Sequence, residues 1–147
     1  MTSFKSIADV LDFAIAREIE AHAFYAKLAG QVTNLDLRQT IEGFALDELQ
    51  HGIRLKAIKA GETAFFDDDV GSLDIAERIS QVQSHPDMSY RELLILAMNR
   101  EKASFRIYSN LASIARRPDC RDALLQLAQE EARHKLRLEI EYDLVTF

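Results

Sequence analysis

The chain matches itself without a gap when it is shifted by 83 residues, and this internal repeat strongly constrains the fold. The stretch AIAREIEAHAFYAKLAG at 14–30 lies over AMNREKASFRIYSNLAS at 97–113, and DELQHGIRL at 47–55 lies over EEARHKLRL at 130–138. From residue 12 to residue 56, thirteen of forty-five positions are identical, against about three expected by chance at ordinary composition. The repeat predicts two copies of one supersecondary unit, related by a pseudo-twofold axis.

The first copy reads as two helices joined by a short turn. Apolar residues recur at helical spacing through residues 6–29 and include Ile19, and Gly30 is placed to end this helix. A second helix is predicted from about residue 34 to residue 59 or 60, with Gly61 after its end. The first copy is therefore a predicted helical hairpin.

The second copy has equally clear start signals. Ser89 and Glu92 have the spacing of a capping box, which predicts a long helix from there to about residue 115. Pro118 suits the first turn of the next helix, because a first-turn residue needs no hydrogen bond from its backbone nitrogen. That helix is predicted to run to about residue 144.

No segment shows the two-residue alternation of a strand, so the predicted fold is all-α. Hairpin 1 covers about 6–60, a crossover covers 61–88, and hairpin 2 covers about 89–145. A short helix capped by Ser72 is predicted inside the crossover. Two hairpins with apolar stripes bury them most simply in a four-helix bundle, a single domain over 1–147.

Composition narrows the classes of function. The net charge of −6 argues against nucleic-acid binding. The start of the sequence lacks the apolar run of a signal peptide, and no segment approaches the ~18 apolar residues of a membrane span. Cys120 is the only cysteine, which excludes disulfides within the chain and cysteine-based metal sites. We therefore expect a cytoplasmic protein that binds neither nucleic acid nor membrane.

Matched carboxylates occupy corresponding positions in the two hairpins. Glu18 and Glu48 are 30 residues apart, with their midpoint at Thr33 in the predicted turn. Residues equidistant from the turn of an antiparallel hairpin lie at the same height, here about 22 Å from the turn. Glu101 and Glu131 are also 30 residues apart about the second turn. Each hairpin should therefore place two glutamates opposite each other.

A histidine follows one glutamate of each pair by three residues, His51 in the first copy and His134 in the second. Residues three apart share a helix face. A single Glu-x-x-His is more often an ordinary polar stripe, but its duplication with a matched glutamate favours a metal site. Four buried glutamates need positive charge nearby, and two divalent cations would neutralise them. One histidine per metal with several carboxylates suits iron or manganese.

The segments AREIEAHAFY, NREKASFRIY, DELQHGIRL and QEEARHKLRLE resemble the helices of the rubrerythrin family, within the ferritin-like superfamily. The resemblance covers essentially the whole chain and implies a ferritin-like four-helix bundle. It implies that the ligands of a di-iron centre are Glu18, Glu48, His51, Glu101, Glu131 and His134. By this similarity Glu48 and Glu131 bridge the two metals, while Glu18 and Glu101 are mainly terminal ligands.

The resemblance also implies a function. A non-haem di-iron oxidoreductase of this type reduces hydrogen peroxide or dioxygen, a role in oxidative stress. The sequence has no Cys-x-x-Cys pairs of a rubredoxin domain, so electrons are expected from an external donor such as a rubredoxin-like protein. The expected cofactor is two iron ions, with manganese or zinc as possible substitutes, and the expected assembly is a homodimer.

Two alternatives stay open. One is ferroxidase activity for iron handling or storage, as in ferritin and bacterioferritin. Leu49 stands where bacterioferritin has a haem-ligating methionine, so no haem is expected. The other is a protein in which the metals serve folding and interaction alone.

Further polar residues have both a structural and a functional interpretation. Tyr25 and Tyr108 lie seven residues after Glu18 and Glu101. They are either packing residues or catalytic helpers whose hydroxyls orient a ligand carboxylate. We interpret His22 as structural. Ser104 stands where many rubrerythrins carry an extra glutamate, which puts efficient peroxidase turnover in doubt.

Overall fold

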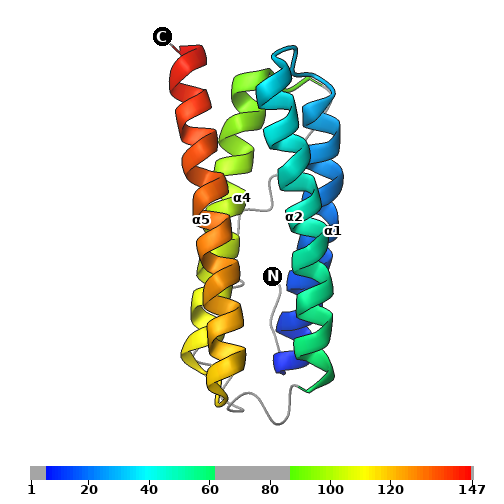
Figure 1. Ribbon diagram of the computed structural model, residues 1–147, viewed down its shortest axis with the longest axis vertical. Helices are drawn as coiled ribbons and strands as arrows, with labels where there is room; N and C mark the ends of the chain where they lie inside the picture. The colour runs from blue at the N-terminus through cyan, green and yellow to red at the C-terminus, as the bar shows by residue number, and fades with distance from the viewer. Residues whose placement is uncertain (1–5, 62–86, 147) are drawn as a thin grey trace. The chain divides into compact units, whose positions relative to one another are not determined.

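The computed structural model describes residues 6–61 and 87–146, and every regular element in these ranges is an α-helix. Figure 1 shows the four helices, α1 (Ile7–Ala29), α2 (Leu35–Ala60), α4 (Tyr90–Ser113) and α5 (Pro118–Thr146). These helices confirm the all-α prediction. The predicted short helix after Ser72 lies outside the described residues.

Local capping chemistry sets the ends of the first two helices. The Ser6 side chain accepts a hydrogen bond from the backbone N–H of Asp9 at the start of α1, and Gly30 caps its end. Asn34 accepts a 2.9 Å hydrogen bond from the N–H of Leu37 at the start of α2. These side chains satisfy N–H groups that have no partner within the helix. The observed ends lie within one or two residues of the predicted ones.

The predicted capping box at the start of α4 is present. The Ser89 hydroxyl accepts a 3.1 Å hydrogen bond from the N–H of Glu92, and the Glu92 carboxylate accepts a 3.2 Å bond from the N–H of Ser89. Helix α5 begins at Pro118, as predicted. In its first turn, a hydrogen bond from the Arg117 side chain lowers the pKa of Asp119. A carboxylate there also interacts favourably with the helix dipole.

The helices form two hairpins, α1 packed against α2 and α4 packed against α5 (Figure 1). The chain divides accordingly into two compact units, one spanning Phe4–Phe65 and the other containing α4 and α5. The turns are short, because only a few residues separate the paired helices. Each hairpin therefore brings side chains at equal distances from its turn close together, as the repeat predicted.

A matched arginine stabilises the turn of each hairpin. The Arg38 side chain donates a 3.2 Å hydrogen bond to the carbonyl oxygen of Ala29, at the end of α1. Its repeat partner Arg121 donates a 3.3 Å bond to the carbonyl oxygen of Ala115. The Ala29 carbonyl also accepts a 3.2 Å hydrogen bond from the N–H of Val32, and Ala115 lies two residues beyond the end of α4. Both arginines thus donate to the turn of their own hairpin, although the two acceptors are not equivalent positions of the repeat.

Each hairpin has an apolar interior. Leu11, Leu28, Ile41 and Leu55 of the first hairpin are at most 2% exposed, and Leu94, Leu111, Leu124 and Leu127 of the second are fully buried. Burying each such side chain contributes about 1.5–3 kcal/mol before the cost of ordering the chain. None of the described helices combines the length and hydrophobicity needed to cross a bilayer.

Candidate metal site

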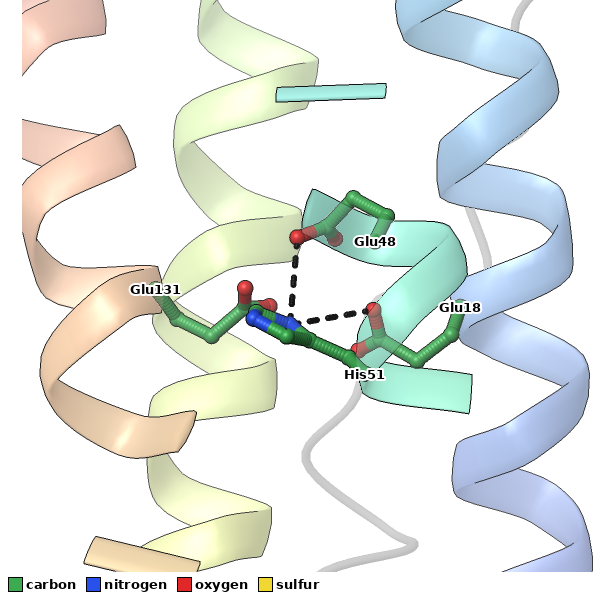
Figure 2. A group of neighbouring side chains, drawn as sticks. All are labelled: Glu18, Glu48, His51 and Glu131. Carbon is green, nitrogen blue, oxygen red and sulfur yellow. Dashed lines mark ion pairs between the residues drawn. The ribbon is translucent and has the colours of Figure 1, made fainter. Parts of the chain in front are cut away.

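Helices α1 and α2 bring two glutamates and a histidine together in the first hairpin (Figure 2). Nδ1 of His51 lies 3.5 Å from Oε2 of Glu18 and 3.4 Å from Oε1 of Glu48. All three residues are at most 1% exposed. We call Glu18, Glu48 and His51 the first triad.

Helices α4 and α5 repeat this arrangement in the second hairpin. Nδ1 of His134 lies 3.6 Å from Oε1 of Glu101 and 3.7 Å from Oε1 of Glu131. These residues, the second triad, are at most 3% exposed. Corresponding distances in the two triads agree within 0.3 Å. The duplicated sequence therefore folds into a duplicated cluster, which a chance polar stripe would not do.

The spacing of each triad fits the ligands of a cation. Nitrogen–oxygen distances of 3.4–3.7 Å are longer than the ~2.7–2.9 Å of a charge-assisted hydrogen bond. Two ligand atoms that bind one metal at about 2.1 Å, with an angle near 110° between them, lie about 3.4 Å apart. Within each triad, one ligand atom per residue can be chosen so that all lie within 4.8 Å of one another. The donor set of two carboxylates and one imidazole suits iron or manganese.

The two buried carboxylates of each triad stay ionised together only if positive charge neutralises them. Removing a carboxylate from water costs several kcal/mol, even after the surrounding protein relaxes. Each triad buries two carboxylates beside one imidazole, which can carry at most one positive charge. A divalent cation would neutralise both carboxylates of a triad. The electrostatics therefore agree with the spacing, although metal binding itself stays a prediction.

The positions of these side chains follow from the sequence by simple helix geometry. Glu48 and His51 are three residues apart on α2, so they share the face that packs against α1. Glu18 reaches the same height because it lies as far before the turn as Glu48 lies after it. The second hairpin uses the same register. The structure thus brings each predicted glutamate to its predicted Glu-x-x-His pair.

Comparisons with known proteins agree with this geometry. Residues 92–143, which include the second triad, match the rubrerythrin family model. A solved structure from Thermotoga maritima, described as a ferritin-like diiron-carboxylate protein, matches with a TM-score of 0.74 at 21% identity. The match covers 97% of this chain and 98% of that one. A search of curated proteins found no significant match.

Residues 92–143 resemble the rubrerythrin family, and the chain has the ferritin-like fold. Both predictions from the sequence are therefore confirmed. At 21% identity, the structural match shows the fold alone, which is the predicted ferritin-like four-helix bundle.

Both tyrosines predicted near the site are buried in this ferritin-like chain. Tyr25 and Tyr108 are each 1% exposed. The Tyr25 ring packs edge-on against Phe44 of α2, with centroids 5.5 Å apart and an interplanar angle of 75°. Such a contact contributes about 0.5–1.5 kcal/mol beyond burial. Tyr25 thus has a packing role, and a role for either hydroxyl in catalysis stays a prediction.

His22 has a structural hydrogen bond, in agreement with our interpretation. Its Nδ1 lies 2.7 Å from the carbonyl oxygen of Ala45, and since a carbonyl can only accept, Nδ1–H is the donor. The bond connects α1 to α2 one turn away from Glu18. In the second hairpin, Ser104 is buried one turn after Glu101. The second hairpin therefore has a hydroxyl at the position where many rubrerythrins carry an extra carboxylate.

Proposed function

We propose that this protein is a non-haem di-iron oxidoreductase of rubrerythrin type, which reduces hydrogen peroxide or dioxygen with electrons from an external donor. The observation that carries the proposal is the pair of matched, buried triads, each with two carboxylates and one imidazole. The ferritin-like fold and the match of residues 92–143 to rubrerythrin support it.

The six triad residues would hold two iron ions. The combined charge of +4 would balance the four glutamates. Bound iron would supply one electron per ion toward cleavage of an oxygen–oxygen bond. The chain itself contributes the ligands, keeps their orientation through helix packing, and excludes bulk water by burial.

Six ligand residues for two ions also leave room for an oxidant. Iron in carboxylate-rich sites accommodates more ligands than three residues supply as single donors. A site built only for stability has its coordination positions filled by the protein. The composition of the triads therefore favours chemistry over a purely structural role.

The experiment that tests this function is anaerobic loading with two Fe(II) ions per chain, followed by rapid mixing with hydrogen peroxide. Oxidation should finish within seconds and consume about one peroxide per pair of irons, because peroxide and two protons accept two electrons to give two waters. Glu131→Ala should lower iron occupancy. Glu130→Ala, which removes the neighbouring carboxylate on α5, is the matched control and should keep it.

If iron-loaded protein reacts with neither peroxide nor dioxygen, the proposed function is wrong. Unchanged metal content in Glu131→Ala would contradict the ligand assignment instead. The two results are separate, because metal content is measured without any oxidant.

Ser104 favours one alternative, a ferroxidase with a role in iron handling. Its buried hydroxyl cannot supply the negative charge of a further glutamate, and this loss would weaken peroxidase turnover. Storage additionally requires a large hollow assembly. Sedimentation with metal analysis separates iron storage from the proposed di-iron oxidoreductase. A dimer that keeps two irons per chain rejects storage, whereas a large particle that accumulates many irons per chain supports it.

A further inference from the structure

The second hairpin has a groove of about 480 Å³ that is lined by residues of α4 and α5. Three cationic side chains and one acidic side chain lie around exposed apolar ones. The principal lining residues are Lys102, Phe105, Arg106, Lys135, Leu136 and Glu139. We call this feature the basic groove, and Lys102, Arg106 and Lys135 the groove cations.

The repeat provides an internal comparison for the basic groove. The first hairpin has uncharged residues at all three positions equivalent to the groove cations, namely Ile19, Ala23 and Gly52. The chain as a whole carries a net charge of −6, so a cluster of three cations is not expected from its composition. Since the metal triads are duplicated but the groove cations are not, helix packing and metal binding do not explain the groove cations.

The basic groove lies at the height of the second triad. Lys102 directly follows Glu101 on α4, and Lys135 directly follows His134 on α5. One residue turns a helix by about 100°, so these lysines point away from the triad without moving along the hairpin. About one helix diameter, ~10 Å, separates the two faces. A redox partner in the groove would therefore come close to the ligands, with the helices as a covalent path.

The apolar centre of the groove suits a short-lived protein contact. Phe105 is 41% exposed and Leu136 is 58% exposed, although exposed apolar groups gain from being covered. Aromatic and arginine side chains are enriched in protein interfaces. Redox proteins typically meet through small interfaces, and charge complementarity raises their rate of encounter. The groove combines an apolar contact with a rim of net positive charge, in which Lys135 forms an ion pair with Glu139.

We propose that the basic groove docks the external electron donor, an acidic one-electron carrier protein. This inference rests on the proposed function and names the surface and the charge of its partner. Each docking event would pass one electron from the reduced donor to the protein. Two such events and two protons reduce one hydrogen peroxide to two waters, so the electrons balance.

The test measures docking directly, as binding, with a purified acidic rubredoxin as the probe. It is titrated into the isotopically labelled full chain, with and without bound metal, and followed by nuclear magnetic resonance. Backbone signals of residues 102–106 and 132–139 should shift. Added salt should weaken the binding, because the Debye length shortens from about 30 Å at 0.01 M to about 10 Å at 0.1 M.

Charge reversal locates the binding surface. Lys102→Glu combined with Arg106→Glu should weaken binding at low salt at least about tenfold, which is ~1.4 kcal/mol. Lys27→Glu combined with Lys56→Glu is the matched control, since it changes the net charge equally at exposed positions of the first hairpin. The control should keep its affinity within about threefold, because remote charges are screened.

Equal losses of affinity in the two double variants would overturn the proposal, as would no binding of the rubredoxin at all. Sedimentation adds one more outcome. If the groove variant dissociates an oligomer but still binds rubredoxin normally, a second copy of the chain occupies the groove and the proposal is wrong. These binding results do not depend on peroxide reactivity, so a failure of the proposed function would be recognised separately.

Discussion

Replacing Glu48 with glutamine should change the stability of the protein in opposite directions with and without metal. Glu48 is 1% exposed, and its Oε1 lies 3.4 Å from Nδ1 of His51. Glutamine keeps the shape of the side chain but removes the buried negative charge. In this variant the His51 imidazole still has the Glu18 carboxylate 3.5 Å away. One of its two carboxylate neighbours therefore remains.

The magnitude follows from burial and chain length. Removing one of two crowded buried carboxylates should stabilise the metal-free protein by about 1–3 kcal/mol. A chain of 147 residues has an unfolding entropy near 0.3 kcal/mol/K, so Tm should rise by about 3–10 °C. With metal at about 1,000 times Kd, each occupied site contributes about 4 kcal/mol. Losing one site, partly offset by the ~1–3 kcal/mol gained on removing the buried charge, should therefore lower Tm by about 3–10 °C relative to the metal-loaded wild type.

The assay is thermal unfolding by circular dichroism at 222 nm, first with a chelator and then with Mn(II), which does not turn over. Glu42→Gln is the matched control on the same helix, because the Glu42 side chain is 57% exposed. It should change stability by less than about 0.5 kcal/mol in both conditions. If Glu48→Gln lowers Tm equally with and without metal, Glu48 is a structural ion-pair residue and the reasoning is refuted.

Three further predictions concern single residues outside the triads. His22→Phe, which copies the residue of the second repeat, should cost about 1 kcal/mol through loss of the bond to Ala45, with metal content unchanged; a loss of metal would make His22 a ligand. Ser89→Ala should cost about 1 kcal/mol in urea unfolding by removing the capping box of α4, and an unchanged midpoint would contradict this. Burial, with help from Glu141, raises the pKa of Tyr90 to about 12. Because the folded-state pKa is the higher one, this stabilisation is fully present below pH ~10 and lost toward pH 12. The urea midpoint of the wild type should therefore fall between pH 10 and pH 12, and Tyr90→Phe should make this fall smaller. Identical pH profiles of the midpoint in wild type and variant would show that Tyr90 does not contribute.

Helix ends were predictable because their causes are local. Ser6, Asn34 and Ser89 each cap a helix through a backbone N–H three residues away. Such contacts depend on neighbouring residues alone, so a short stretch of sequence contains all the information. Gly30 and Pro118 mark boundaries for equally local reasons.

The triads were predictable for a different reason. In an antiparallel hairpin, one number, the distance from the turn, decides which residues meet across the two helices. The repeat shows the same distance from the turn in both hairpins. As that distance predicts, Glu18 and Glu101 lie beside their Glu-x-x-His pairs. That two iron ions bind there stays a prediction, tested by the experiments above.

Which side of a helix becomes buried was harder to predict. Ile19 belongs to the apolar pattern of α1, yet it is 55% exposed in the structure. Its neighbour Glu18 is 1% exposed, the reverse of what hydrophobicity alone suggests. Helix periodicity defines a stripe about 100° wide, and a residue at its edge falls inside or outside according to how the partner helix packs.

The sequence by itself determined the helices, their ends, the hairpin register and the matched glutamates and histidines. These features depend on contacts a few residues apart or on symmetry about a turn. Only the tertiary structure decided that His22 bonds to Ala45, that Tyr25 packs against Phe44, and that the groove cations gather around Phe105. Such contacts depend on how each helix is rotated about its own axis against its partner, and the packing of many side chains together sets that rotation.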